Sequence, residues 1–113
     1  MQVTIWHNPR CSNSRGALQL LRGRGIEPAA VDYLARPPDR ATLEKVAEAC
    51  GGARALVRSK EPLYAELGLA GADDAVLLEA MLAHPVLINR PVVITPRGIR
   101  LCRPPETVLE LLD

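Results

Sequence analysis

The sequence predicts an α/β fold with one mixed four-stranded sheet, in the order β-α-β … β-β-α, and an all-helical insertion between its two halves. Short segments rich in β-branched residues lie near both ends of the 113-residue chain, whereas the middle carries helical periodicity. With 48% hydrophobic residues, the chain has enough apolar side chains to form a buried core. Its length fits a single domain, residues 1–113, with the insertion at about residues 39–83.

The first third of the chain predicts a β-α-β unit. Residues 2–7 alternate in polarity and predict a strand, which Asn8-Pro9 ends. A helix follows from about Ser12, and Gly25 marks its end. Residues 29–34 predict a second strand. Because a crossover helix joins the two strands, we expect them to pair in parallel.

The middle of the chain predicts helices only. Pro37-Pro38-Asp39 opens a helix with one apolar stripe, and Gly51-Gly52 ends it. Residues 53–70 predict short helical pieces, broken by a proline and a glycine. Asp73 or Asp74 caps a further helix, which a proline ends. The stripe of the first of these helices consists of Leu43, Val46, Ala47 and Cys50.

The last third predicts a β-hairpin and a helix. Residues 91–95 and 99–102 predict two strands, joined by a turn at 96–98. Pro104 or Pro105 then begins the final helix. A parallel pair beside an antiparallel hairpin, with helices covering the sheet, is the thioredoxin-like arrangement.

The charge and cysteine content narrow the classes of partner. Fourteen basic residues oppose 13 acidic ones, so we expect no nucleic-acid partner and no anionic membrane surface. No apolar run approaches the roughly 18 residues of a membrane span, and no secretory signal pattern is visible. Three cysteines favour reduced thiols in a cytoplasmic protein, which we expect to be a monomer. The basic residues are 12 Arg and only 2 Lys, which either codon bias or oxyanion binding explains.

The segment HNPRCSNSR, from His7 to Arg15, is the densest candidate site. Cys11 lies just before a helix, where free backbone N–H groups and the helix dipole favour an anion such as a thiolate. His7, Arg10 and Arg15 are neighbouring cations that favour it further, so Cys11 is a candidate nucleophile near neutral pH. Ser14 takes the place of the second cysteine of a C-x-x-C motif. Its hydroxyl can donate to the thiolate but cannot resolve a disulfide, so a redox cycle needs an external thiol.

Each of these residues also has a structural interpretation. Cys11 is alternatively a small buried apolar residue, and Ser14 a residue of the first helical turn. His7 is alternatively a histidine at a strand end with a structural hydrogen bond. No metal site is expected at His7 and Cys11, because their spacing spans a loop and no further ligand cluster exists.

Arginines outside this segment are candidates for binding an anion. Arg90 precedes Pro91, which marks a strand start, a sheet edge or a cis bond. The hairpin is expected to bring Arg90 and Arg103 to one end of the sheet, where two guanidinium groups can bind a tetrahedral oxyanion. Arg58 is a weaker candidate, and ordinary surface charge remains the alternative for all three. Cys102 fits either packing or a role beside Arg103.

These segments together resemble the glutaredoxin-coupled arsenate reductases. The resemblance lies in HNPRCSNSR at 7–15, RALVR at 54–58, HPVLINR at 84–90 and LCRP at 101–104. It extends over essentially the whole chain in one order and one spacing. It implies a thioredoxin-like fold in which Pro91 is the cis-proline.

The resemblance also implies roles for individual residues. Cys11 matches the nucleophile that attacks arsenate, and His7 and Ser14 match residues that favour its thiolate. The positions that bind the oxyanion correspond to Arg58, Arg90 and Arg103. Glutathione is implied as a co-substrate, and glutaredoxin as the partner that resolves the mixed disulfide. The product is arsenite, and no tightly bound cofactor is implied.

We therefore expect a glutaredoxin-dependent arsenate reductase that serves arsenic resistance. One alternative is a glutathione-dependent thiol reductase with another substrate, and a second is a redox-sensing regulatory module that binds a protein partner. The C-x-x-S motif disfavours the regulatory module, because no disulfide can form within that loop. A phosphatase is disfavoured because the loop has no acidic residue to protonate a leaving alcohol.

Overall fold

The computed structural model describes residues 1–112, so Asp113, the last residue of the expected domain 1–113, lies outside the described residues. The chain forms two compact units. The sheet unit comprises Met1–Arg36 and the chain from Arg90 onward, and the helical unit comprises Pro37–Asn89. The helical unit is somewhat longer at both ends than the insertion expected at about 39–83. That the two units form one domain stays a prediction.

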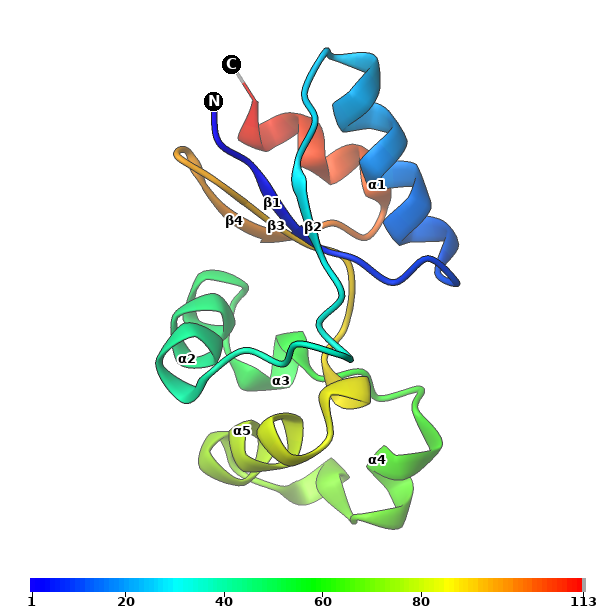
Figure 1. The fold of residues 1–113 in the computed structure, drawn as a ribbon. Helices are drawn as coiled ribbons and strands as arrows, with labels where there is room; N and C mark the ends of the chain where they lie inside the picture. Colours follow the sequence, from blue (N-terminus) through cyan, green and yellow to red (C-terminus); the bar gives the residue numbers. More distant parts are fainter. Residues whose placement is uncertain (113) are drawn as a thin grey trace. The chain divides into compact units, whose positions relative to one another are not determined.

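The sheet unit contains a four-stranded mixed sheet with the order β2-β1-β3-β4 (Figure 1). Its strands are β1 (Thr4–Trp6), β2 (Ala29–Val31), β3 (Val92–Thr95) and β4 (Gly98–Leu101). β1 pairs with β2 in parallel, whereas the β1–β3 and β3–β4 pairs are antiparallel. The predicted fold class is thereby confirmed.

The two N-terminal strands are shorter than the predicted segments 2–7 and 29–34. The His7 N–H still donates to the Val31 carbonyl at 2.9 Å, but the sheet ends there. The Asp32 carboxylate then accepts from the Leu34 N–H at 3.1 Å, which turns the chain. The predicted segments therefore run past the ends of β1 at Trp6 and of β2 at Val31.

Helix α1 (Ser12–Gly23) and the 3-10 helix η3 (Pro105–Leu111) pack against one face of the sheet (Figure 1). A Cβ atom added at Gly16 would lie only 2.9 Å from the Pro105 Cγ, so glycine lets α1 and η3 approach closely. Cys102 is fully buried in this core. Of the two interpretations of Cys102, packing and a role beside Arg103, burial favours packing. The core of this unit comprises Val3, Ile5, Ala17, Leu21, Val93, Cys102, Val108, Leu111 and Leu112.

The helical unit is built from short helices with polar caps. Asp39 caps α2 by accepting from the Thr42 N–H at 2.8 Å, and Asp73 caps α5 by accepting from the Val76 N–H at 3.0 Å. Cys50, expected on the apolar stripe, is half-buried at the C-terminal cap of α2. The helices are α2 (Arg40–Ala49), α3 (Ala53–Leu56), α4 (Pro62–Glu66), α5 (Asp74–Ala83) and the 3-10 helices η1 (Leu69–Gly71) and η2 (Pro85–Leu87).

Arg54 connects several parts of the helical unit. Its guanidinium donates to the Tyr64 hydroxyl at 2.6 Å, to the Leu69 carbonyl at 3.2 Å and to the Ala72 carbonyl at 2.6 Å. The three acceptors lie in α4, in η1 and directly after η1. Arg54 therefore holds the α4–α5 connection against α3.

Among residues 1–112, none of the helices combines the length and the apolar composition that a membrane crossing requires.

Candidate active site

A tight turn between β1 and α1 sets the position of Cys11. The Cys11 N–H donates to the Asn8 carbonyl at 3.0 Å, and the Asn8 side-chain oxygen accepts from the Arg10 N–H at 2.9 Å. An asparagine followed by proline favours such a turn, because the asparagine side chain bonds to the backbone two residues later. Cys11 consequently becomes the N-cap of α1, where a serine or aspartate usually accepts from backbone N–H groups.

The environment of the Cys11 sulfur favours the thiolate. Cys11 is only 8% exposed, and this burial by itself raises the pKa of the thiol. The backbone N–H of Ser14, the Arg90 guanidinium and the backbone N–H of Asn13 together outweigh burial, so the pKa of Cys11 lies below its ordinary value. Cys11 is therefore a partly shielded nucleophile rather than an inert core residue.

Two arginines from the C-terminal half lie beside this sulfur. The Arg103 Nη1 lies 3.7 Å from the Cys11 Sγ and donates to the Arg90 carbonyl at 3.0 Å. Each arginine directly precedes a cis-proline, at Arg90–Pro91 and Arg103–Pro104. The cis bond expected at Pro91 is confirmed, and the one at Pro104 was not anticipated. The β3–β4 hairpin thus brings the two guanidinium groups to one end of the sheet, as expected.

His7 and Ser14 form a hydrogen bond beneath the turn. The His7 Nδ1 and the Ser14 Oγ are 2.6 Å apart, and the same Oγ accepts from the Asn8 N–H at 3.0 Å. The fully buried Ser14 hydroxyl thus bonds to His7 and Asn8, whereas the thiol interacts with the Ser14 backbone N–H. Ser14 consequently supports the turn that carries Cys11.

The positive charge at the thiol comes from residues distant in sequence. Burial, followed by the charges of Arg22 and Arg15, lowers the pKa of His7, so His7 is neutral near pH 7. Arg15 donates to the Pro9 carbonyl at 2.9 Å and secures the turn. The lowered pKa of the half-buried His7 argues against the expectation that it is a cation acting on Cys11.

Arg58, the third arginine expected to bind an anion, belongs to the helical unit. Its Nε lies 3.7 Å from a carboxylate oxygen of Glu61, and its backbone N–H donates to the Leu87 carbonyl at 2.7 Å. Its side chain is 21% exposed. The other five expected site residues lie in the sheet unit, in or beside the Cys11 turn.

Sequence reasoning missed two asparagines of this segment. Asn8 shapes the turn through both its carbonyl and its side chain, and the Asn-Pro pair was the available signal. Asn13 contacts Arg103, a residue 90 positions away, and no local pattern indicates such a contact.

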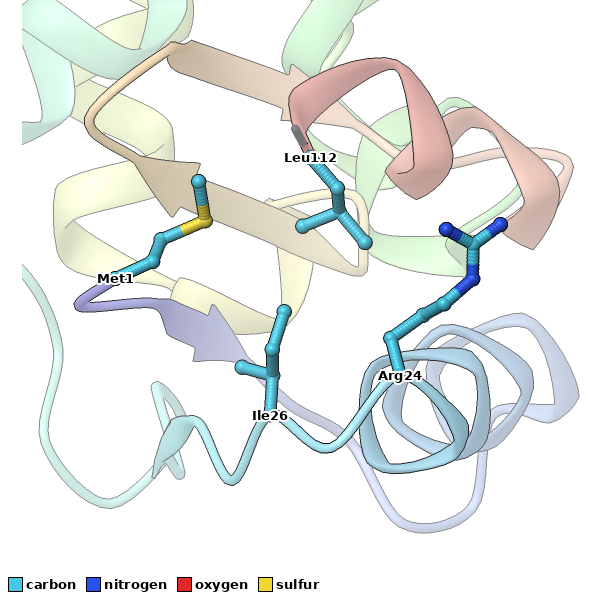
Figure 2. A pocket seen from close by; sticks show the side chains of 4 residues that line it. All are labelled: Met1, Arg24, Ile26 and Leu112. Atoms are coloured by element: carbon cyan, nitrogen blue, oxygen red, sulfur yellow. The ribbon is translucent and has the colours of Figure 1, made fainter.

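Two hollows of the sheet unit differ in their relation to this segment. One of about 200 Å³ is lined by Met1, Arg24, Ile26 and Leu112 and shares no residue with the Cys11 turn (Figure 2). The other, of about 430 Å³, borders the turn and is lined by His7, Pro9, Arg15, Leu18, Gln19 and Arg22. Within residues 1–112 no three His, Cys, Asp or Glu side chains are grouped so that they could hold a metal ion. The cationic groups at Cys11 can bind an oxyanion, and the thiolate can attack its central atom.

Comparisons with known proteins agree with this chemistry. The model of the ArsC family matches residues 6–111. The arsenate reductase of Rhizobium meliloti (strain 1021) is 52% identical over 115 residues, which cover 99% of this chain and 82% of the relative. The arsenate reductase of Escherichia coli (strain K12) is 50% identical, over 97% of this chain and 80% of the relative. The solved arsenate reductase from Vibrio cholerae is 44% identical, with a TM-score of 0.92 over 99% of this chain and 98% of that one.

Proposed function

The chain belongs to the ArsC family, and on this basis we propose that it reduces arsenate to arsenite, with Cys11 as the nucleophile and glutathione and glutaredoxin as electron donors. The observation that carries the proposal is the cationic environment of one thiol. The Cys11 sulfur has the Arg103 guanidinium at 3.7 Å, and Arg90 lowers its pKa. A tetrahedral dianion such as arsenate suits this combination of guanidinium groups and a nucleophile.

In the first step the Cys11 thiolate attacks the arsenic atom. A sulfur–arsenic bond forms, and one arsenate oxygen leaves as water after protonation. Arg90 and Arg103 would stabilise the negative charge on the remaining oxygens, because both guanidinium groups lie beside the sulfur that binds arsenic. Arg58 is the third arginine of the proposal and would add a further cation. His7 and Ser14 hold the turn that keeps Cys11 at the helix N-terminus.

The second step transfers two electrons to arsenic. A glutathione thiolate attacks the Cys11 sulfur of the adduct, forming a sulfur–sulfur bond while the sulfur–arsenic bond breaks. The bonding pair remains on arsenic, which leaves as arsenite. A glutaredoxin thiolate then attacks the glutathione sulfur of the mixed disulfide, which regenerates the Cys11 thiolate. Arsenate and two thiols thus become arsenite, water and one disulfide.

Ser14 accounts for the external reductant. It takes the place of a second cysteine, and its hydroxyl is bonded to His7 and Asn8. The disulfide must therefore be resolved by a thiol from outside the loop. The proposal places the enzyme in the glutathione-rich cytoplasm, as a monomer with no tightly bound cofactor.

The test is a coupled assay with glutathione, glutaredoxin, glutathione reductase and NADPH. We expect arsenate-dependent NADPH oxidation that is lost in Cys11→Ser, because a hydroxyl at this position is a far weaker nucleophile than a thiolate. Cys50→Ser is the matched control, since it removes a half-buried thiol from the helical unit and should retain turnover.

Arsenate turnover by Cys11→Ser equal to that of the unmodified protein would overturn the proposal. Reduction of glutathionylated substrates without any arsenate turnover would assign the protein to the glutathione-dependent thiol reductases instead. Tight, oxidation-sensitive binding of a protein partner without turnover would identify a regulatory module.

A further inference from the structure

The guanidinium of Arg103 has two oxygen acceptors from different parts of the chain. Its Nη1 donates to the Arg90 carbonyl at 3.0 Å and lies 3.7 Å from the Cys11 sulfur. The second acceptor is the amide of Asn13. With the amide oxygen turned toward Arg103, that oxygen accepts from Nη1 and from Nη2 at 3.3 Å each. This orientation is the one that the hydrogen bonds require, because the amide nitrogen would otherwise face only donors.

We propose that Asn13 is a positioning residue for the reaction, and that its side-chain oxygen aims the Arg103 guanidinium at Cys11 and at the bound oxyanion. The proposal rests on the proposed function, since it assigns Arg103 to anion binding. Asn13 is the second residue of α1, two positions after Cys11. The helix that stabilises the thiolate therefore also carries the group that orients the cation.

The physical reason lies in the freedom of an arginine side chain. Fixing the guanidinium of an arginine costs a large part of the rotamer freedom of its side chain. With a single acceptor, the guanidinium can still rotate about that one hydrogen bond. Two acceptors, the Arg90 carbonyl on Nη1 and the Asn13 oxygen on both Nη1 and Nη2, restrict the orientation of the guanidinium. A guanidinium fixed in advance does not have to be ordered when the anion binds.

The neutrality of Asn13 is as important as its oxygen. An amide oxygen accepts from Arg103 without cancelling the positive charge that the anion needs. An aspartate at this position would bind Arg103 more strongly but would place a negative charge beside both the thiolate and the arsenate. The first turn of α1 contains no acidic residue. The negative charge of an aspartate would interact favourably with the helix dipole there and would stabilise the helix. Helix stability therefore favours an acidic residue at position 13, whereas anion binding favours a neutral one.

Asn13→Ala tests the proposal through the split between KM and kcat. We expect the KM for arsenate to rise about tenfold, the equivalent of one hydrogen bond to a charged group, with a much smaller change in kcat. The binding of inorganic phosphate, measured as protection of Cys11 from iodoacetamide, should weaken by a similar factor. Ser12→Ala is the matched control, because Ser12 is the exposed neighbour on the same helical turn, and it should change neither value.

Asn13→Asp separates positioning from a structural role. We expect this variant to melt at the same or a higher temperature than the unmodified protein, and yet to bind phosphate more weakly. Its Cys11 alkylation midpoint should move to higher pH. Weaker phosphate binding at unchanged stability would exclude a loss of helix stability as the cause, whereas retained phosphate binding would overturn the proposal.

The decisive measurement compares Asn13→Ala in two backgrounds. In Arg103→Ala, the further change Asn13→Ala should alter phosphate protection by less than about twofold, because no guanidinium remains to be aimed. A full tenfold effect in that background would show that Asn13 acts on the anion directly and would refute the proposal. The phosphate measurement requires no turnover. A protein that binds phosphate as expected but does not reduce arsenate would therefore contradict the proposed function and not the role of Asn13.

Discussion

In the helical unit the Arg54 guanidinium donates to a tyrosine hydroxyl and to two backbone carbonyls, whereas in the sheet unit that of Arg103 meets the Arg90 carbonyl and the Cys11 thiol. The acceptors of Arg54 are all neutral groups of its own unit, so its charge serves to hold chain segments together. One neighbour of Arg103 is a reactive sulfur, so its charge is available to an anion. The same side chain thus has a structural or a catalytic role depending on which acceptors surround it.

This comparison explains the excess of arginine over lysine only in part. The planar guanidinium, with its several N–H donors, suits both roles. At Arg54 it donates to several acceptors within the chain, and at Arg103 it is proposed to bind an oxyanion. Other arginines form exposed ion pairs through a single contact, such as Arg100 with Glu110, where lysine would serve nearly as well. Codon bias remains a sufficient explanation for these exposed residues.

The largest effect is expected from Arg103→Ala. Arsenate turnover should fall about 100-fold or more, because one donor to the developing oxyanion is lost. The free energy of unfolding should change by less than about 1 kcal/mol, since only contacts of a half-buried side chain are removed. Steady-state kinetics and urea denaturation measure the two quantities. Turnover within threefold of the unmodified enzyme would mean that Arg103 is an ordinary surface charge.

A smaller and opposite effect is expected from Arg54→Ala. Its free energy of unfolding should fall by about 1–2 kcal/mol, because an exposed guanidinium with three internal acceptors is removed. The rate of Cys11 alkylation should not change. Arg54→Lys is the matched variant, since one ammonium cannot reach three separated acceptors and should recover only part of the stability. Loss of arsenate turnover at unchanged stability would instead place Arg54 in the site.

The contrast between these arginines also shows what the sequence could predict. The Cys11 turn is local, and its asparagine, proline and helix start are adjacent, so the position of the nucleophile was predictable. The same holds for the helix start at Asp39, whereas the cis bond at Pro91 was one of three local alternatives and was singled out by the family resemblance. Each depends on residues within one or two turns of chain.

Features that depend on distant residues were not predictable. Neighbours in sequence suggested His7, Arg10 and Arg15 as the cations at the thiol, but Arg90 and Arg103 occupy that place. A guanidinium reaches acceptors several ångströms from its backbone, so spacing along the chain does not determine its partners. The end of β2 was misplaced for a different, local reason, because the Asp32 side chain accepts from the Leu34 N–H and turns the chain. The predicted hairpin placed Arg90 and Arg103 at one end of the sheet, and only the family resemblance linked the two arginines to Cys11.

The smallest effect concerns the protonation of His7. Burial lowers its pKa first, and the charges of Arg22 and Arg15 lower it further, whereas Asp32 opposes them. In an NMR titration the His7 ring should therefore titrate below the ordinary histidine value of about 6.5. His84→Gln assigns the signals, since the chain has two histidines. Arg22→Gln should move the His7 midpoint upward, and Arg24→Gln, which removes an exposed charge near the end of the same helix, should not.

The sign of the accompanying stability change follows from linkage. Because the pKa of His7 is lower in the folded than in the unfolded protein, the unfolded state binds the proton more readily. The contribution of neutral His7 is therefore fully present above about pH 6.5 and is lost as the pH falls toward the lower, folded-state pKa. Stability measured by urea denaturation should thus fall less between pH 7 and pH 5 in His7→Gln than in the unmodified protein. A His7 midpoint above about 7 would instead make this residue mainly a cation at neutral pH, and would return it to the set of positive charges that act on Cys11.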